Sequence, residues 1–170
     1  MYWIGIDNGT TGSIAVLNGT EAHYYEMPTK SEQSYTKSRQ KVTRIDTVAL
    51  ENILSKYTES RCIIERPMVN PKRWKASASA IRALEATLIV LEKLGIPYQY
   101  IDSKEWQKAM LPRDMGKLVI INGVEKRKVE PAELKKASLD IARRLFPSVT
   151  PKKDGDSLLI AEYFRRFNLN

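Results

Sequence analysis

Four acidic residues stand where the sequence predicts that a strand ends or a helix begins, and carboxylates held in such places can bind metal ions. Asp7 closes the apolar run YWIGID before a glycine turn, and Glu65 closes the run RCIIE ahead of Pro67. Asp154 and Asp156 stand at the start of the last predicted helix, where the helix dipole favours negative charge. If these elements meet at one sheet edge, the carboxylates form a cluster of hard oxygen ligands that suits Mg²⁺ or Mn²⁺ rather than zinc.

Each acid also has an ordinary structural explanation. An acid at a strand end is commonly a turn former, and an acid at a helix start is commonly an N-cap. It is the combination of two strand ends and one helix start that favours a shared metal site. Soft ligands are scarce, because the chain has one histidine and one cysteine. That excludes a His/Cys zinc site and a disulfide within the chain.

The composition predicts a globular protein with a polyanionic partner. Hydrophobic residues make up 42% and charged residues 28% of the 170 residues, and no apolar run reaches the roughly 18 residues of a membrane helix. The net charge of +8 favours nucleic acid as the partner, with a basic protein lacking such a partner as the alternative. The length predicts a single domain over residues 1–170, and an N-terminus without a signal-peptide pattern predicts a cytoplasmic location.

Short apolar runs and turn residues predict the strands. An antiparallel meander is expected from the runs at 2–7, 13–17 and 22–27, which the turns NGTTG and NG separate. Further strands are expected at 61–65 and 96–101. Two connecting segments differ in kind. Residues 28–44 are basic without apolar periodicity and predict a mobile loop, whereas KLVIINGVEKRK within 112–130 has the Asn-Gly signature of a hairpin.

Capping residues and apolar spacing predict the helices. They are expected from the cap Asp46 to about Tyr57, from about Ala76 to Leu94, over 103–110 with Ser103 as N-cap, from Pro131 to about Phe146, and from near Asp156 through SLLIAEYFRRF. The side chains expected to face the core are Val48, Leu50, Ile53 and Leu54, then Ile81, Leu84, Leu88 and Leu91, then Leu134, Ala137, Ile141 and Leu145. Leading strands and following helices predict a mixed α/β sandwich with helices on the sheet faces.

Five blocks in order, IGIDNGTTGSIAVL, IIERP, IPYQYIDSKEWQKAM, KKASLDIARRLFP and KKDGDSLLIAEYFRR, cover most of the chain. Together they resemble the RuvC-type Holliday junction resolvases, especially the phage-encoded branch. The resemblance implies an RNase H-like fold, with a mixed five-stranded sheet whose first three strands are antiparallel and with helices on both faces. It also implies a homodimer that resolves four-way DNA junctions by paired symmetric nicks, leaving 5′-phosphate and 3′-hydroxyl ends, in the host cytoplasm if the protein is phage-encoded.

The resemblance implies a site of two Mg²⁺ ions, with Mn²⁺ as the alternative, bound by four carboxylates. The first two match Asp7 and Glu65, and the last two fall on the block KKDGDSLLIA. Family members space the last two acids farther apart than Asp154 and Asp156, which are two residues apart. Within a helix that spacing turns two side chains about 200° apart. Asp154 must therefore precede the helix if both bind metal, and otherwise it only caps the helix.

Basic, apolar and aromatic residues outside the acids are candidate DNA contacts. They are Met68, Lys72, Arg73, Trp74 and Lys75 after the second acid, Lys37, Arg39, Lys41 and Arg44 in the basic loop, and Lys136. A surface loop with one anchoring tryptophan, and a solvated run of charge, are the alternatives. One of Lys135 and Lys136 is expected to approach the acids. The resemblance implies that the helix over 76–94 helps to build the dimer interface, although by itself such an apolar stripe more often belongs to the core.

Two rival functions remain open. GIDNGTTGSIAVL is also similar to the first phosphate loop of actin-like and sugar-kinase ATPases, but those need two lobes and a longer chain, and no Walker-type motif is present. We therefore expect no nucleotide cofactor. Another RNase H-like nuclease, or a junction-binding protein without activity, is the second rival. Four carboxylates facing DNA would oppose binding unless metal filled the site, which argues against a pure binder.

Overall fold

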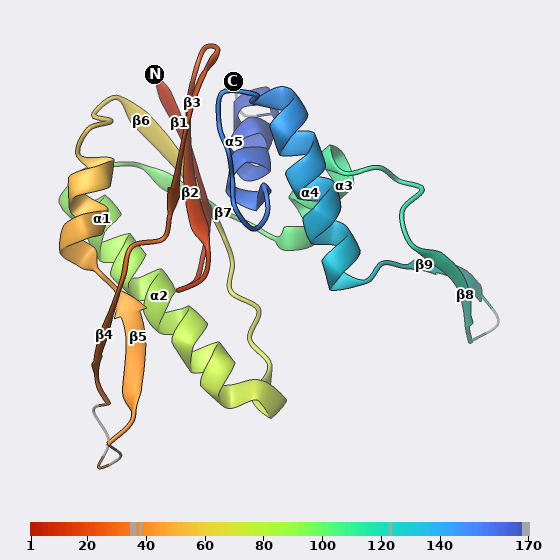
Figure 1. Cartoon of the computed structure of the whole chain (residues 1–170), viewed down its shortest axis with the longest axis horizontal. Helices are drawn as coiled ribbons and strands as arrows, with labels where there is room; N and C mark the ends of the chain where they lie inside the picture. Colours follow the sequence, from red (N-terminus) through yellow and green to blue (C-terminus); the bar gives the residue numbers. More distant parts are fainter. Residues whose placement is uncertain (35–36, 38, 123, 168–170) are drawn as a thin grey trace.

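Five strands form one mixed sheet, in the order β3-β2-β1-β6-β7 (Figure 1). The computed structural model describes residues 1–34, 37, 39–122 and 124–167. The antiparallel strands are β1 (Tyr2–Asp7), β2 (Ser13–Asn18) and β3 (Glu21–Glu26), and the strands parallel to β1 are β6 (Ser60–Glu65) and β7 (Tyr98–Ile101). The predicted meander and the predicted five-stranded sheet are confirmed.

Helices cover both faces of the sheet (Figure 1). One face carries α1 (Thr47–Leu54) and α2 (Trp74–Lys93), and the other carries α3 (Ser103–Met110), α4 (Pro131–Leu145) and α5 (Asp156–Phe167). Side chains alternate along a strand, so β1 supplies both cores. Ile4 and Ile6 are buried on the α1 and α2 face, whereas Trp3 is buried on the α5 face.

The close approach of α5 to the sheet depends on Gly5 in the middle of β1. A Cβ at this position would overlap the backbone of Ser157 and Ala161. Because neither backbone can yield as a flexible side chain would, only glycine fits here. This contact lets the buried residues of α5, which include Leu158 and Leu159, pack directly on β1.

The segment 28–44 is not the mobile loop that we predicted. It forms a hairpin of β4 (Thr29–Gln33) and β5 (Lys41–Ile45), described apart from its turn, where residues 35, 36 and 38 lie outside the description. Glu32 contacts Arg44 across the ribbon at 2.7 Å and Lys30 on its own strand at 3.0 Å. The prediction failed because backbone pairing and this ion triple form the ribbon, and neither produces an apolar period in the sequence.

The second hairpin is confirmed. It consists of β8 (Lys117–Ile121) and β9 (Val124–Lys128), paired in antiparallel register. Asn122 has a φ of 52°, as the predicted turn requires, while Gly123 of that turn lies outside the described residues. Among the described residues, no helix is long and apolar enough to cross a bilayer.

The helices differ from their predictions mainly in the side chains that they bury. α1 ends at Leu54, and its Val48 is 67% exposed because it lies opposite the buried Leu50 and Leu54. α4 buries Ser138 and Ala142, leaving Leu134, Ala137 and Ile141 half-buried and Leu145 exposed. Small side chains occupy these buried positions because α4 packs closely against the start of α5.

α2 begins at Trp74, two residues before the predicted start, and a 3-10 turn at Pro71–Arg73 precedes it. Its buried side chains are Ser77, Ala83, Thr87, Val90 and Leu91. Of the predicted stripe, therefore, Leu91 is buried, Leu84 and Leu88 are half-buried, and Ile81 is 43% exposed. The prediction placed the buried face wrongly because it considered only large apolar side chains, whereas α2 approaches the sheet through small ones.

Candidate metal centre

Three of the four predicted acids lie together at the carboxyl end of β1. Among the described residues, Asp7, Asp154 and Asp156 offer carboxylate oxygens that all lie within 4.8 Å of one another. Asp154 is 4% exposed, and the other two are half-buried. The helix α5 begins at Asp156, so Asp154 precedes it. The two-residue spacing is therefore compatible with both side chains reaching one place.

Tight packing at Gly155 places the two C-terminal acids. The Gly155 N–H donates to the hydroxyl of Ser138 on α4 at 3.2 Å. A Cβ on Gly155 would overlap Ala142 and the Ser138 carbonyl, so a larger residue would push the start of α5 away from α4. On the sheet side, Ser13 donates to Ser157 at 2.8 Å and ties β2 to the same helix turn. The backbone around the acids is therefore held from both sides.

Glu65 lies beside Asp7, but its carboxylate forms hydrogen bonds with residues of α3. The parallel register pairs Ile6 with Ile64, which places Asp7 and Glu65 at neighbouring strand ends. The Glu65 carboxylate accepts hydrogen bonds from Ser103 Oγ at 2.5 Å and from Trp106 Nε1 at 2.7 Å. It does not belong to the group of three mutually close acids.

The residues of α3 that hold Glu65 were not predicted for this role. Ser103 was expected to be the N-cap of α3, but that cap is Asp102, and the Ser103 hydroxyl serves Glu65 instead. Trp106 is fully buried one helical turn later and so needs a partner for its N–H. The sequence did contain a pattern that could have predicted this role. Trp106 follows Ser103 by three residues in a short polar helix, and that spacing puts both side chains on one face.

The electrostatics of the cluster are dominated by burial and by repulsion between carboxylates. Burial, with added repulsion from Glu65, Asp156 and Asp154, raises the pKa of Asp7 well above its usual value. Burial also raises the pKa of Asp156 to about 6, against a lowering by its hydrogen bond from Ser138. A cation placed among these carboxylates would favour their ionised forms and offset the repulsion.

Among the described residues, one ammonium forms an ion pair with the cluster. Lys135 Nζ lies 3.2 Å from Asp154 Oδ2, and this hydrogen bond raises the pKa of Lys135. Of the two lysines considered from sequence, Lys135 is thus the one near the acids, while Lys136 is exposed. A single ammonium facing several carboxylates leaves an excess of negative charge.

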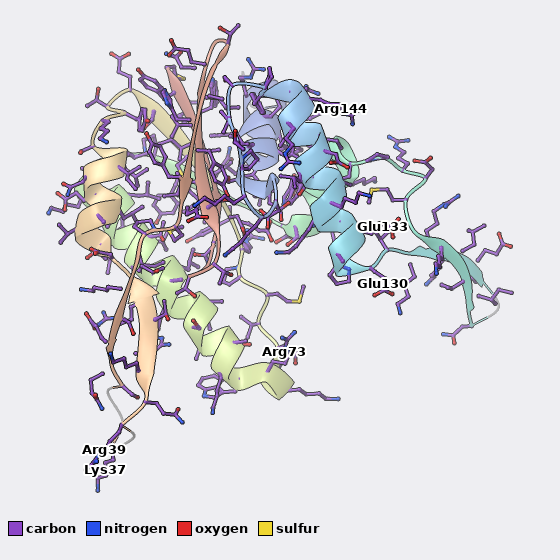
Figure 2. All side chains as sticks on the ribbon, in the orientation of Figure 1. Lys37, Arg39, Arg73, Glu130, Glu133 and Arg144 are labelled. Carbon is purple, nitrogen blue, oxygen red and sulfur yellow. The ribbon has the colours of Figure 1, made fainter. Side chains whose placement is uncertain are left out.

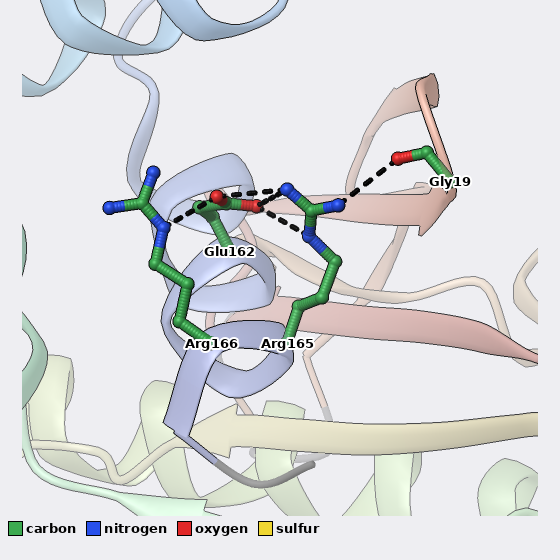
Figure 3. A network of polar contacts seen from close by, with 4 residues as sticks. All are labelled: Gly19, Glu162, Arg165 and Arg166. Atoms are coloured by element: carbon green, nitrogen blue, oxygen red, sulfur yellow. Dashed lines mark hydrogen bonds and ion pairs between the residues drawn. The ribbon is translucent and has the colours of Figure 1, made fainter.

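A second buried acid shows how this chain satisfies a carboxylate without metal (Figure 3). Glu162 on α5 is 2% exposed and contacts both Arg165, at 2.8 Å, and Arg166, at 2.6 Å. Arg165 also donates to the carbonyl of Gly19 at 3.1 Å. Two guanidinium groups here face one carboxylate, whereas at the cluster around Asp7 several carboxylates face one ammonium group.

These residues fit a divalent ion. The cluster offers oxygen donors from three residues within the reach of one ion, with Glu65 adjoining them, and its charge is not balanced by protein cations. Hard oxygen ligands of this kind match Mg²⁺ and Mn²⁺.

The candidate DNA contacts lie outside the cluster and are open to solvent. After Glu65, Met68 is 81% exposed and Trp74 is 68% exposed, and Figure 2 shows Arg73 at the start of α2. The other predicted side chains are also exposed, namely Lys72, Lys75, Lys37, Arg39, Lys41, Arg44 and Lys136. Lys37 and Arg39 stand at the far end of the β4–β5 hairpin (Figure 2).

The backbone beneath these exposed side chains is ordered by local hydrogen bonds. Asn70 Oδ1 accepts from the Lys72 N–H at 3.0 Å, and the Ser77 hydroxyl both accepts from the Asn70 N–H at 2.9 Å and donates to its carbonyl at 3.0 Å. Met68 and Trp74 are therefore presented from a supported segment. An exposed apolar pair on such a segment is available for contact with a partner.

Two antiparallel and two parallel pairings join the five strands, and helices cover both faces. This α/β fold is similar to that of solved RuvC structures. One similar solved structure is Thermus thermophilus RuvC in complex with Holliday junction substrate, with a TM-score of 0.61 and 16% sequence identity over 99% of this chain and 97% of that chain. A second is a Thermus thermophilus RuvC structure, with a TM-score of 0.59 and 15% identity over the same shares. No protein-family model and no curated protein matches the sequence.

Proposed function

We propose that this protein is a divalent-metal-dependent endonuclease that resolves four-way DNA junctions. The convergence of Asp7, Asp154 and Asp156 at one sheet edge carries the proposal, because the buried charge there calls for a cation. The fold is that of a RuvC solved with a Holliday junction substrate, and the net charge of +8 suits a polyanion. The residue blocks extend the proposal to the phage-encoded branch, acting in the cytoplasm of the host.

Asp7, Asp154 and Asp156, together with Glu65, would hold two Mg²⁺ ions, and Mn²⁺ suits the same ligands. When bound, the ions would supply an activated water and charge neutralisation at the leaving 3′ oxygen, so the products carry a 5′-phosphate and a 3′-hydroxyl. Ser103 and Trp106 keep the Glu65 carboxylate in one orientation. Lys135 has a side chain that is 59% exposed, so its ammonium can turn from Asp154 to a phosphate oxygen.

The exposed segment between β6 and α2 would contact the branch point. Met68 and Trp74 offer apolar and aromatic surface against an unpaired base, and the neighbouring Lys72, Arg73 and Lys75 offer charge to phosphates. Lys37, Arg39 and Lys41 on the β4–β5 hairpin, and Lys136 on α4, would contact the arms.

We further propose that one domain spans residues 1–170 and pairs with a second copy through α2. Ile81 and Ile89 are 43% and 55% exposed and lie eight residues apart on one helix ridge. The small residues Ala76, Ala78 and Ala80 at the start of α2 would allow close approach. Two subunits related by a two-fold axis would present two sites to a junction of similar symmetry, as paired nicks require.

The decisive experiment compares the wild type with Asp7→Asn on a synthetic four-way junction and on a linear duplex of the same sequence, in Mg²⁺. We expect paired symmetric nicks in the junction alone, and their loss in the variant, whose folded DNA-binding surface should still bind the junction. Equal cutting of the linear duplex would overturn the junction assignment. Cutting confined to an RNA–DNA hybrid would point to another RNase H-like nuclease, and ATP turnover to the kinase alternative.

A further inference from the structure

The β8–β9 hairpin stands clear of the sheet and its helices (Figure 1). Its described side chains are exposed apart from the half-buried Val119, and Ile120 reaches 76% exposure. An isolated two-stranded ribbon is only marginally stable in water, so a ribbon of this kind usually has a partner. Nothing in the candidate metal centre uses it.

The two faces of the ribbon differ in charge. Cross-strand partners share a face, so the register puts Lys117, Lys128 and Lys126 together with Val119. Lys117 stands directly opposite Lys128, an arrangement that destabilises a free ribbon. Lys128 contacts Glu130 at 3.2 Å, between side chains that are each about two-thirds exposed. This face therefore carries more positive charge than the protein around it neutralises.

Hydrogen bonds connect the base of the ribbon to its neighbouring segments. Arg127 donates to the carbonyls of Asp114 at 2.8 Å and Gly116 at 3.2 Å, and the Gly116 N–H donates to Glu133 at 3.0 Å. Glu133 lies in the first turn of α4, the helix that brings Lys135 to Asp154. The direction of the ribbon is thus set by the helix that also contacts the acid cluster.

The acids lie at one end of the molecule, and the ribbon stands to one side of that end. Figure 1 shows the carboxyl end of β1 between the β4–β5 hairpin and the β8–β9 hairpin. In Figure 2, Lys37 and Arg39 mark the far end of the first hairpin, and Glu130 and Glu133 mark the base of the second. A long ligand that passes the acids would meet both ribbons.

We infer that the β8–β9 hairpin grips a duplex DNA arm, with Lys117 and Lys126 contacting its phosphates. This inference rests on the proposed function. Five residues of strand extend about 17 Å, or roughly five base pairs of duplex, and a two-stranded ribbon fits the major groove. Phosphates bound to the basic face would relieve the repulsion between the lysines. Leu118 and Ile120, on the opposite face, would be buried against the wall of the groove.

The test combines Lys117→Gln with Lys126→Gln, in an Asp7→Asn background that binds without cutting. Its control combines Arg143→Gln with Arg144→Gln, which removes the same charge from exposed positions at the opposite end of α4 (Figure 2). Binding to a labelled junction is measured over a range of salt concentrations. We expect the hairpin variant to reduce the slope of log affinity against log salt by about two, because each lost phosphate contact removes about 0.9.

A second arm of the experiment shortens the duplex arms stepwise. The difference between the hairpin variant and its control should vanish once the arms no longer reach the ribbon. If the parent protein binds the junction but both variants share one slope, the hairpin inference is overturned while the proposed function stands. If the hairpin variant keeps its slope but changes its oligomeric state in size-exclusion chromatography, the ribbon binds protein and the inference is likewise overturned. Failure of the parent to bind any junction would sink the proposed function itself.

Discussion

Asp7, Asp154 and Asp156 form the proposed metal site, and their close approach opposes folding. Each carboxylate loses hydration, and the three repel one another across less than 4.8 Å. The chain could have balanced them with arginines, as it does around Glu162. Among the described residues, a lysine pairs with the cluster instead, and negative charge remains that a divalent cation would neutralise. Such a site is expected to become more stable when its cation binds.

The stability of the metal-free protein should therefore depend on pH through Asp156. Its pKa is about 6 in the folded protein against an ordinary 3.8, so the folded state binds this proton more tightly than the unfolded chain. The resulting stability is fully present below pH 3.8 and is lost as the pH rises through about 6. Over about pH 5 to 7.5 the loss should be roughly 1.4 kcal/mol, the free energy of one pKa unit.

Thermal denaturation in EDTA across this window measures the effect. Asp156→Asn should make the profile less steep, because the neutral amide has no proton to lose, and the raised pKa of Asp7 should account for the dependence that remains. Asp140→Asn, at an exposed position of α4, is the matched control and should keep the wild-type profile. An unchanged pH dependence in Asp156→Asn would show that the charge of Asp156 is not the cause.

Among the secondary-structure elements, α3 has a role beyond covering the sheet, because it holds Glu65. Trp106 is buried in the same core as Trp3, but its N–H reaches the Glu65 carboxylate at 2.7 Å. Ser103 supplies the second hydrogen bond from the first turn of α3. The orientation of this predicted metal ligand therefore depends on a helix from another part of the chain.

Trp106→Phe should raise the Mg²⁺ concentration needed for half-maximal cleavage by at least about tenfold, since residues that orient metal ligands contribute on this scale. A smaller aromatic ring keeps part of the packing, while the hydrogen bond is lost. Cleavage rates across a Mg²⁺ titration give the measurement. Trp3→Phe provides a matched control, because Trp3 is a buried tryptophan of the same core with no contact to Glu65 in the described structure. Equal Mg²⁺ requirements in the two variants would mean that Trp106 contributes packing alone.

At the scale of the whole molecule, the proposed activity needs two sites at once. The exposed ridge of α2, with Ile81 and Ile89, is the apolar surface that we assign to pairing with a second copy. The two hairpins and the segment around Trp74 project at the end that holds the acids (Figure 1). A dimer would therefore place four ribbons around one four-way junction.

Ile89→Asp should give a monomer in analytical ultracentrifugation, because a buried, unpaired carboxylate is strongly unfavourable at an apolar interface. The monomer should remain folded and nick junctions singly rather than in pairs. Val48→Asp makes the same change at a 67% exposed position on α1 and should leave the mass unchanged. A wild-type mass for Ile89→Asp would remove α2 from the interface.

Local patterns in the sequence were sufficient for much of the fold. The turns at NGTTG and Asn18–Gly19 predicted the meander, and Asp46 was correctly placed as a helix cap that accepts from Ala49. Such features depend on backbone conformation and on hydrogen bonds between near neighbours, so nearby residues are enough to predict them. The β4–β5 hairpin was missed because its stability comes from pairing across the ribbon.

The sequence by itself determined which residues could bind a metal, since oxygen ligands are abundant at element ends and softer ligands are nearly absent. Only the tertiary structure decided how they combine. It brought Asp154 to Asp7 ahead of α5, turned Glu65 toward Trp106, and chose Lys135 over Lys136. The physical reason is that these contacts join segments far apart along the chain, and their geometry depends on close packing at Gly5 and Gly155. Periodicity along the sequence does not record such packing.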